Sequence, residues 1–170
     1  MVMRNPTFIM AITTGDTAPD FTLVTLGENG PELFTLSEAL KDSKVVLLFV
    51  PMAFTSVCTE EFCDVSQGLG EYKELGATVV GISGDSPFAQ SAWAEKEGIS
   101  LPLLSDYQHQ VAEAYGIAYE QFLPEKNLIM GGVPKRSAFV IGQDGKVLYA
   151  EVNDHPKDLP DFAKVKAALA

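Results

Sequence analysis

Two short apolar runs limit the folds open to this chain more than any other feature of its sequence. Val45–Val50 contains only valine, leucine and phenylalanine, and Ala77–Ile82 is a second run of similar character. Runs of this length without polar alternation are typical of strands that are buried on both faces of a sheet. A helix-like segment follows each run, so we expect strands and helices to alternate along the chain.

The remaining segments extend this alternation and complete the predicted fold. Further strands are predicted at 21–26, 101–104, 137–141 and 146–152, and helices at 35–40, 55–75, 86–97, 109–115 and 158–169. The last two strands flank Gly142-Gln143-Asp144-Gly145, a typical hairpin turn. The sequence therefore predicts an α/β fold with a mixed central sheet flanked by helices. Residues 1–12 are expected to form a flexible N-terminal lead-in, and residues 13–170 a single domain.

The charge balance excludes several classes of partner. The chain has 12 basic and 23 acidic residues, a net charge of -11, so it repels phosphate backbones and anionic lipid. We therefore predict no nucleic acid and no membrane partner. The longest apolar run, Val45–Phe54, is interrupted by Pro51 and is too short to span a bilayer. The N-terminus lacks the long apolar region of a secretory signal, which predicts a cytoplasmic protein.

The two cysteines of the chain, Cys58 and Cys63, do not form a disulfide framework for a domain of this size. Neither they nor His109 and His155 have the spacing of a zinc site, and both histidines are expected at the surface. We therefore predict no metal, and no organic cofactor is implied either, since the sulfur of a reactive cysteine carries redox chemistry itself. The cysteines are then either reactive or inert.

Cys58 lies at the predicted start of a helix, shortly after a buried strand. A thiol in a first helical turn faces unpaired backbone N–H groups and the positive end of the helix dipole. Both stabilise a thiolate, the nucleophile that attacks the O–O bond of a peroxide and becomes a sulfenic acid. A free cysteine is also often only a small buried hydrophobic residue, so position alone leaves both interpretations open.

The residues around Cys58 form the longer pattern Pro51-x-x-x-Thr55-x-x-Cys58. This pattern resembles the active-site signature of the peroxiredoxins, and the likeness extends from Gly15 to about Glu151. Other segments similar to that family lie at 81–85, 102–106 and 134–141. The resemblance implies a thioredoxin-like fold with an N-terminal extension. It also implies a thiol peroxidase that reduces hydrogen peroxide or small organic hydroperoxides through Cys58.

The resemblance also assigns roles to four residues around the cysteine. Thr55 Oγ would form hydrogen bonds with the thiolate and the peroxide, and Arg136 would supply a positive charge beside the sulfur. Pro51 would exclude water, Glu61 would orient Arg136, and backbone N–H groups at the helix start would bind the peroxide oxygens. Each residue has a plain alternative: a helix cap, a strand terminator, a surface arginine or an acid that complements the helix dipole. The catalytic interpretation is favoured because all four plain alternatives would otherwise have to occur together by coincidence.

Cys63 follows Cys58 by five residues and is a candidate resolving thiol. On one straight helix this spacing separates the Cα atoms by about 8.7 Å. A disulfide requires less than about 7 Å, so the turn would have to unwind first. The spacing resembles the bacterioferritin-comigratory-protein branch of the peroxiredoxins, whereas residues 89–106 and 112–116 resemble the one-Cys AhpE-type branch. A buried packing role for Cys63 also stays open.

Three other functions are alternatives to the peroxidase. A redox sensor or relay would use the same Cys58, whereas a thioredoxin-type oxidoreductase requires a Cys-x-x-Cys motif that the chain lacks. An enzyme like glutathione peroxidase would place a Trp at the thiol, but Trp93 is expected in the core or at an interface, on a distant helix. The family resemblance implies a thioredoxin-like or low-molecular-weight thiol as reductant, and a homodimer.

Overall fold

The computed structural model describes residues 10–170, and within them seven strands form one mixed sheet. The strands are β1 (Thr22–Gly27), β2 (Gly30–Thr35), β3 (Lys44–Phe49), β4 (Ala77–Ser83), β5 (Leu103–Ser105), β6 (Ser137–Ile141) and β7 (Val147–Val152). Their order across the sheet is β2-β1-β5-β4-β3-β6-β7. The three central strands, β5, β4 and β3, are parallel, and β6 and β1 pair antiparallel to them on either side.

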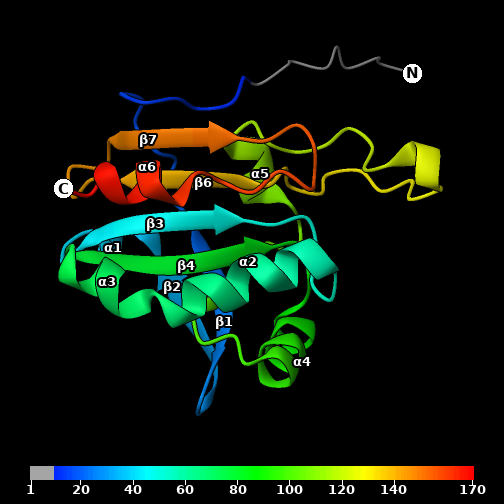
Figure 1. Cartoon of the computed structure of the whole chain (residues 1–170), viewed down its shortest axis with the longest axis horizontal. Helices are drawn as coiled ribbons and strands as arrows, with labels where there is room; N and C mark the ends of the chain where they lie inside the picture. Colours follow the sequence, from blue (N-terminus) through cyan, green and yellow to red (C-terminus); the bar gives the residue numbers. More distant parts are fainter. Residues whose placement is uncertain (1–9) are drawn as a thin grey trace.

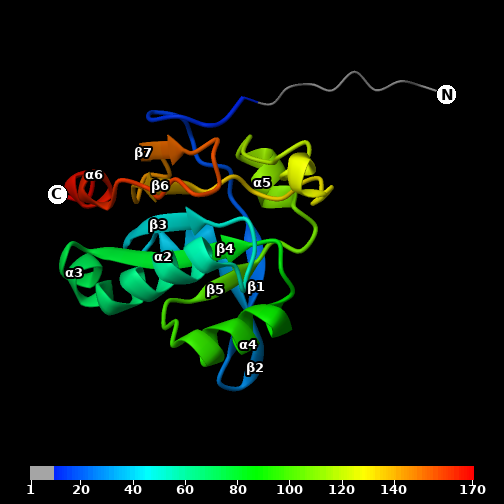
Figure 2. The ribbon, with the colours of Figure 1, turned by 45° about the vertical axis from the view of Figure 1, so that its right-hand side comes forward.

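Helices cover both faces of this sheet (Figures 1 and 2). They are α1 (Leu36–Ala39), α2 (Ser56–Gln67), α3 (Leu69–Glu74), α4 (Pro87–Glu97), α5 (Gln110–Ala114) and α6 (Phe162–Ala167), with a 3-10 turn at Pro124–Lys126. In Figure 1, α2, α3 and α6 lie in front of the sheet and α5 lies behind it. The predicted α/β fold with a mixed sheet between helices is confirmed.

Strand β3 separates two hydrophobic cores because its side chains alternate between the faces. Val46 and Leu48 point into the core beneath α2 and α4, and Leu47 and Phe49 point into the core that contains α1 and α5. All four side chains are fully buried, as the uninterrupted apolar run predicts. The loop after β3 leads directly into α2, so the central strand sets where Cys58 lies.

Two elements differ from the prediction. Residues 27–30 form a turn as expected, but β2 follows it and pairs with β1 in a hairpin. The helix predicted from residue 55 or 56 to 75 is divided at Gly68 into α2 and α3. Gly68 has no Cβ and a poor helix propensity, so the chain bends there without steric cost.

Residues 117–136 form an excursion with little regular structure, which the sequence did not reveal. Isolated bridges, Ala118 with Pro134 and Phe122 with Met130, draw this segment into a narrow loop that carries the 3-10 turn. At the other end of the chain, Ile12 N–H donates to Tyr115 O, while residues 1–9 of the predicted lead-in lie outside the described residues. No helix between residues 10 and 170 has the length and apolarity that a membrane crossing requires.

Candidate active site

Cys58 lies in the first turn of α2 and is 1% exposed. The strand β3 ends at Phe49, and a six-residue loop brings the chain back so that α2 starts near the carboxyl ends of β3 and β4 (Figure 1). The sulfur therefore lies where the first backbone N–H groups of α2 have no partner within the helix. The position agrees with the sequence prediction.

Arg136 directs its guanidinium group at this sulfur from the neighbouring strand. It directly precedes β6, which pairs with β3, and its Nη2 donates to Cys58 Sγ at 3.2 Å. Nη1 pairs with Glu61 Oε2, and both Nε and Nη2 donate to the Pro156 carbonyl, at 3.0 and 2.8 Å. Arg136 is 1% exposed, so a buried cation is held by one carboxylate, one carbonyl and one sulfur.

The electrostatics of this cluster follow from its burial. Burial raises the pKa of Glu61 to about 7, although the charge of Arg136 and its hydrogen bond oppose the shift. For Arg136, burial lowers the pKa, but the charges and hydrogen bonds of Cys58 and Glu61 outweigh it and the net direction is upward. Arg136 therefore stays a cation and stabilises negative charge on the sulfur.

Thr55 and Pro51 both line the site, but Thr55 differs from its expected bonding. Thr55 Oγ1 donates its proton to Met52 O at 2.9 Å, so that proton is not available to the sulfur of Cys58. Thr55 is at the N-cap position of α2, yet its side chain makes no capping hydrogen bond. Its oxygen lone pairs remain free to accept a hydrogen bond from a peroxide O–H. Pro51 is buried within the loop before α2.

A cavity of about 340 Å³ opens onto Cys58 and has mostly apolar walls. The loop before α2 and the first turn of α2 form one wall, and the 117–136 excursion forms another through Phe122, Leu123 and Leu128. The exposed side chains of Lys126, His155 and Lys157 lie at its rim. The sequence did not predict these further walls, because they come from loops without a recognisable pattern.

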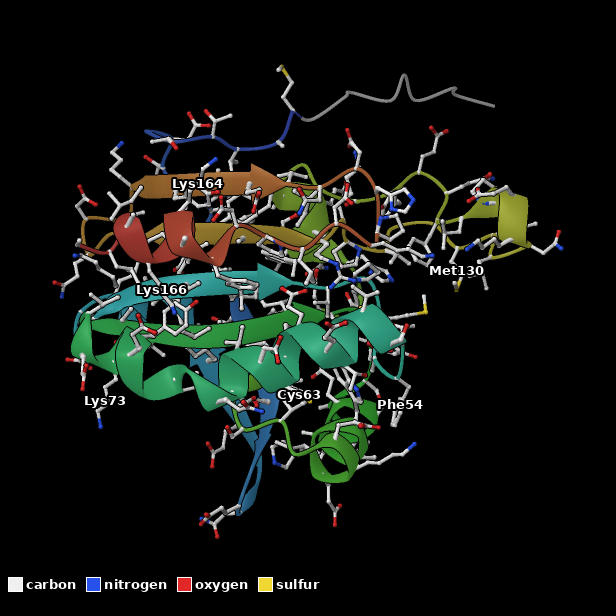
Figure 3. All side chains as sticks on the ribbon, in the orientation of Figure 1. Phe54, Cys63, Lys73, Met130, Lys164 and Lys166 are labelled. Carbon is white, nitrogen blue, oxygen red and sulfur yellow. The ribbon has the colours of Figure 1, made fainter. Side chains whose placement is uncertain are left out.

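Cys63 lies on the same continuous helix as Cys58, on the side of α2 that faces α4 (Figure 3). It is half-buried, and its Sγ donates to Glu97 O near the end of α4 at 3.3 Å. Burial and the nearby carboxylates of Glu97 and Asp64 raise the pKa of Cys63. In this state the two thiols are separated by an intact helix, and Cys63 is held as a protonated donor.

Trp93 and His109 correct two expectations. Trp93 is fully buried as predicted, but its helix is not distant from the site: Nε1 donates to Thr59 Oγ1 at 3.0 Å, one residue after Cys58. The His109 ring is partly buried, and its Nδ1 has no partner in the described residues. A Cβ at Gly84 would lie 2.3 Å from its Cε1, and a Cβ at Gly132 would lie 3.2 Å from its Cδ2. The missing side chains of the two glycines create this slot. His155 is exposed, as predicted.

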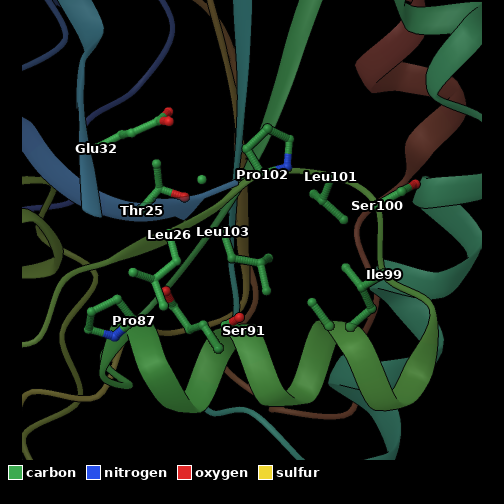
Figure 4. A pocket seen from close by; sticks show the side chains of 13 residues that line it. Thr25, Leu26, Glu32, Pro87, Ser91, Ile99, Ser100, Leu101, Pro102 and Leu103 are labelled. Carbon is green, nitrogen blue, oxygen red and sulfur yellow. The ribbon is translucent and has the colours of Figure 1, made fainter. Parts of the chain in front are cut away.

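A second cavity, of about 360 Å³, lies between α4 and the β1–β2 hairpin (Figure 4). Thr25 and Glu32 line it from the hairpin, Pro87 and Ser91 from α4, and residues 99–103 from the segment before β5. Neither cysteine nor Arg136 lines this cavity, so it has no part in thiol chemistry.

Comparison with known proteins agrees with this geometry. The pattern of the AhpC/TSA family matches residues 14–150. Alkyl hydroperoxide reductase E of Mycobacterium bovis is 32% identical over 161 residues, covering 94% of this chain and 97% of the relative. Peroxiredoxin Bcp of Escherichia coli is 36% identical over 133 residues, covering 78% and 81%. The crystal structure of peroxidoxin BcpB from Mycobacterium tuberculosis superimposes with a TM-score of 0.78 at 36% identity, covering 93% and 96%.

The fold, with a cysteine at a helix start beside a buried arginine, defines a thiol peroxidase of the thioredoxin-like class. The chain belongs to the AhpC/TSA family, the peroxiredoxins, as the sequence resemblance predicted. Relatives of both branches noted from the sequence, the AhpE type and the Bcp type, match it at similar identity.

Proposed function

We propose that Cys58 of this protein reduces hydrogen peroxide and small organic hydroperoxides, and that Arg136, Thr55 and Pro51 complete the catalytic site. The observation that supports this most directly is the hydrogen bond of 3.2 Å from Arg136 Nη2 to Cys58 Sγ at the base of an open cavity. A cation fixed beside the sulfur stabilises both the thiolate and the negative charge on the departing oxygen. Glu61 and the Pro156 carbonyl hold that cation in place.

The first chemical step breaks the O–O bond of the peroxide. The Cys58 thiolate attacks one oxygen and becomes a sulfenic acid, while the other oxygen leaves as hydroxide or alkoxide and takes a proton to give water or an alcohol. Thr55 accepts a hydrogen bond from the peroxide O–H, and the N–H groups at the start of α2 bind its oxygens. Cys58 is oxidised by two electrons and the peroxide is reduced by two.

We further propose that Cys63 resolves the sulfenic acid. The Cys63 sulfur attacks the sulfenic sulfur of Cys58, a disulfide forms, and the oxygen leaves as water. Because α2 is continuous through both cysteines, its first turns must unwind before the sulfurs meet. A thioredoxin-like protein or a low-molecular-weight thiol then reduces the disulfide, which suits the reducing cytoplasmic location expected from the sequence.

A one-Cys cycle is the second candidate for the same site. The hydrogen bond of Cys63 to Glu97 O and the raised pKa of Cys63 favour a protonated, less nucleophilic thiol in the folded state. In that cycle an external thiol attacks the Cys58 sulfenic acid directly.

A peroxide sensor or relay would use the same first step but pass the oxidation to a partner protein. A homodimer remains a proposal that rests on the family alone.

The intact mass of the reduced protein, before and after one equivalent of hydrogen peroxide, tests these proposals. Loss of two hydrogen atoms that requires both cysteines is the result expected for the Cys58–Cys63 disulfide. Gain of oxygen in the wild type indicates the one-Cys cycle. The variant Cys58→Ser is expected to keep its mass, and Cys63→Ser to gain oxygen. An unchanged wild-type mass would reject the peroxidase itself.

A further inference from the structure

The loop between β3 and α2 adopts a backbone that needs support from outside. Phe54, near its end, has φ of 62°, a left-handed conformation that a bulky side chain adopts only when its surroundings enforce it. Phe54 is itself 52% exposed and lies at the start of α2 (Figure 3), so burial of its ring does not supply the whole constraint. Thr55 follows it, and Cys58 lies one helical turn further on.

One hydrogen bond ties the later part of this loop to the sheet, in addition to the Val50 N–H that donates to Ile82 O at 3.0 Å directly after β3. The Ala53 N–H donates to Asp85 Oδ2 at 2.8 Å. Asp85 follows β4. Because β3 and β4 are parallel neighbours, the segments after both strands begin at the same end of the strands. The hydrogen bond from Thr55 Oγ1 to Met52 O joins two residues of the loop and therefore cannot fix the loop relative to the sheet.

Asp85 is held in turn by a buried polar network. Ser105 Oγ donates to Asp85 O at 2.6 Å, and the Asp85 N–H donates to Ser83 Oγ at 3.4 Å. Gln90 Nε2 donates to Ser83 Oγ at 2.9 Å and to Leu104 O at 2.8 Å. Ser83, Gln90 and Ser105 are all 3% exposed or less. The turn after β4 is therefore rigid, and its carboxylate is a fixed anchor for the loop.

We propose that Asp85 is a positioning residue that holds the Ala53–Thr55 loop and the first turn of α2 in the form that reacts with peroxide. The inference rests on the proposed function and concerns the same site. With the bond intact, Thr55 and the N–H groups at the helix start face the cavity. When the hydrogen bond to Asp85 breaks, residues 53–55 lose that tie, while the contacts of Cys58 with Arg136 and of Thr59 with Trp93 remain. Unwinding of the first turn of α2 toward Cys63 then becomes easier.

This anchor influences two competing fates of the oxidised cysteine. In the folded site, the Cys58 sulfenate attacks a second peroxide and becomes a sulfinic acid, with release of water or alcohol. In the unwound site, Cys63 attacks the sulfenic sulfur, a disulfide forms and water leaves. A loop released from Asp85 therefore reacts more slowly with the first peroxide and forms more disulfide relative to sulfinic acid.

The test compares Asp85→Ala with Asp85→Asn, whose amide oxygen accepts the same N–H. Asp42→Ala is the matched charge control, because Asp42 precedes β3 at the opposite end of the strand from the site. We expect Asp85→Ala to lower the second-order rate constant of Cys58 oxidation about tenfold and to lower the sulfinic fraction at high peroxide, as measured by intact mass. Asp85→Asn and Asp42→Ala are expected to stay close to wild type.

Three outcomes of the substitution experiment would overturn the inference. They are an Asp85→Ala variant that oxidises like wild type, an Asp85→Asn variant as slow as Asp85→Ala, and slower oxidation with an unchanged ratio of disulfide to sulfinic acid. Amide hydrogen exchange of the wild type adds a test without substitution. The Ala53 N–H should be protected in the reduced protein and exposed in the disulfide form, and an unprotected Ala53 in the reduced protein also overturns it. A wild type that peroxide does not oxidise rejects the proposed function instead.

Discussion

At the scale of single residues, Arg136 concentrates the chemistry of the site because one guanidinium group makes three kinds of contact. It donates to the sulfur of Cys58, to the carboxylate of Glu61 and to the carbonyl of Pro156. A lysine ammonium keeps the charge but cannot reach three fixed partners with the geometry of a planar fork. The position therefore requires arginine.

We predict that Arg136→Lys lowers the rate constant of Cys58 oxidation by about 100-fold, as loss of a fixed donor to developing charge does in other enzymes. Stopped-flow oxidation with hydrogen peroxide measures this. Lys135→Met is the control. Lys135 pairs with Asp154 at the surface, so this substitution removes a neighbouring charge without changing any contact of the sulfur. A similar loss in both variants would mean that net charge, and not the directed guanidinium, is responsible.

The raised pKa of Glu61 leads us to predict that the free energy of unfolding depends on pH. Its pKa rises from 4.5 to about 7 in the folded protein, so between these values the folded state binds more protons than the unfolded chain. The contribution of protonated Glu61 is complete below pH 4.5, and the free energy of unfolding declines as the pH rises toward 7. Urea unfolding at about pH 5 and about pH 8 should show a larger decline for wild type than for Glu61→Gln. Equal declines would contradict this assignment.

The residues of the site differ in how far the sequence reveals them. Cys58, Arg136 and Glu61 carry distinctive side chains at motif spacing, and the structure brings all three together. The acceptor at Pro156 is a backbone carbonyl. Every residue has such a carbonyl, so the sequence could not reveal this contact. Asp85 was visible in a matching segment, but its bond to Ala53 depends on the parallel register of two strands.

At the scale of elements, the sequence revealed those that bury a continuous apolar face. Strands β3 and β4 are recognisable because both of their faces are covered. Strand β2, with the sequence GPELFT, is exposed along much of its length, so neither alternation nor an apolar run marks it. The excursion at 117–136 is organised by isolated bridges and not by periodic burial, and no pattern could predict it.

The contact between β4 and α2 makes a prediction about Gly81. A Cβ at Gly81 would lie 2.6 Å from ring atoms of Phe62 and 2.9 Å from Leu103 Cδ2, and Phe62 is fully buried. We expect Gly81→Ala to lower the free energy of unfolding by about 1–3 kcal/mol through overpacking. Gly70→Ala in α3 meets no atom within 4 Å, and it should be neutral or stabilising. Denaturant unfolding of both variants measures the difference, and equal stabilities would contradict the overpacking.

At the scale of the whole molecule, the active-site cavity is assembled from three loops far apart in the sequence. The loop before α2 leads into the turn that carries Cys58, the 117–136 excursion adds an apolar wall, and residues 155–157 complete the rim. The mixed sheet brings them together because β3 and β6 are neighbours and Arg136 directly precedes β6. With a volume of about 340 Å³, the cavity has room for a molecule larger than hydrogen peroxide.

We predict that Leu123→Asp lowers kcat/KM for cumene hydroperoxide several-fold more than for hydrogen peroxide. The aromatic group of the larger substrate needs the apolar wall, whereas hydrogen peroxide needs only the groups around the sulfur. Leu33→Asp, at a site 76% exposed on β2, is the control for adding a charge. The same loss for both substrates would assign Leu123 to the structure of the loop and not to substrate selection.

The hydrogen bond from Trp93 to Thr59 has a practical consequence. The chain contains one tryptophan, and its indole N–H bonds to the residue that follows Cys58, while its ring lies 6.4 Å from the ring of Phe54. Any unwinding of the first turn of α2 breaks that bond and changes the polarity around the indole. The emission of this single tryptophan should therefore report the unwinding that the proposed Cys58–Cys63 disulfide requires, without any added label.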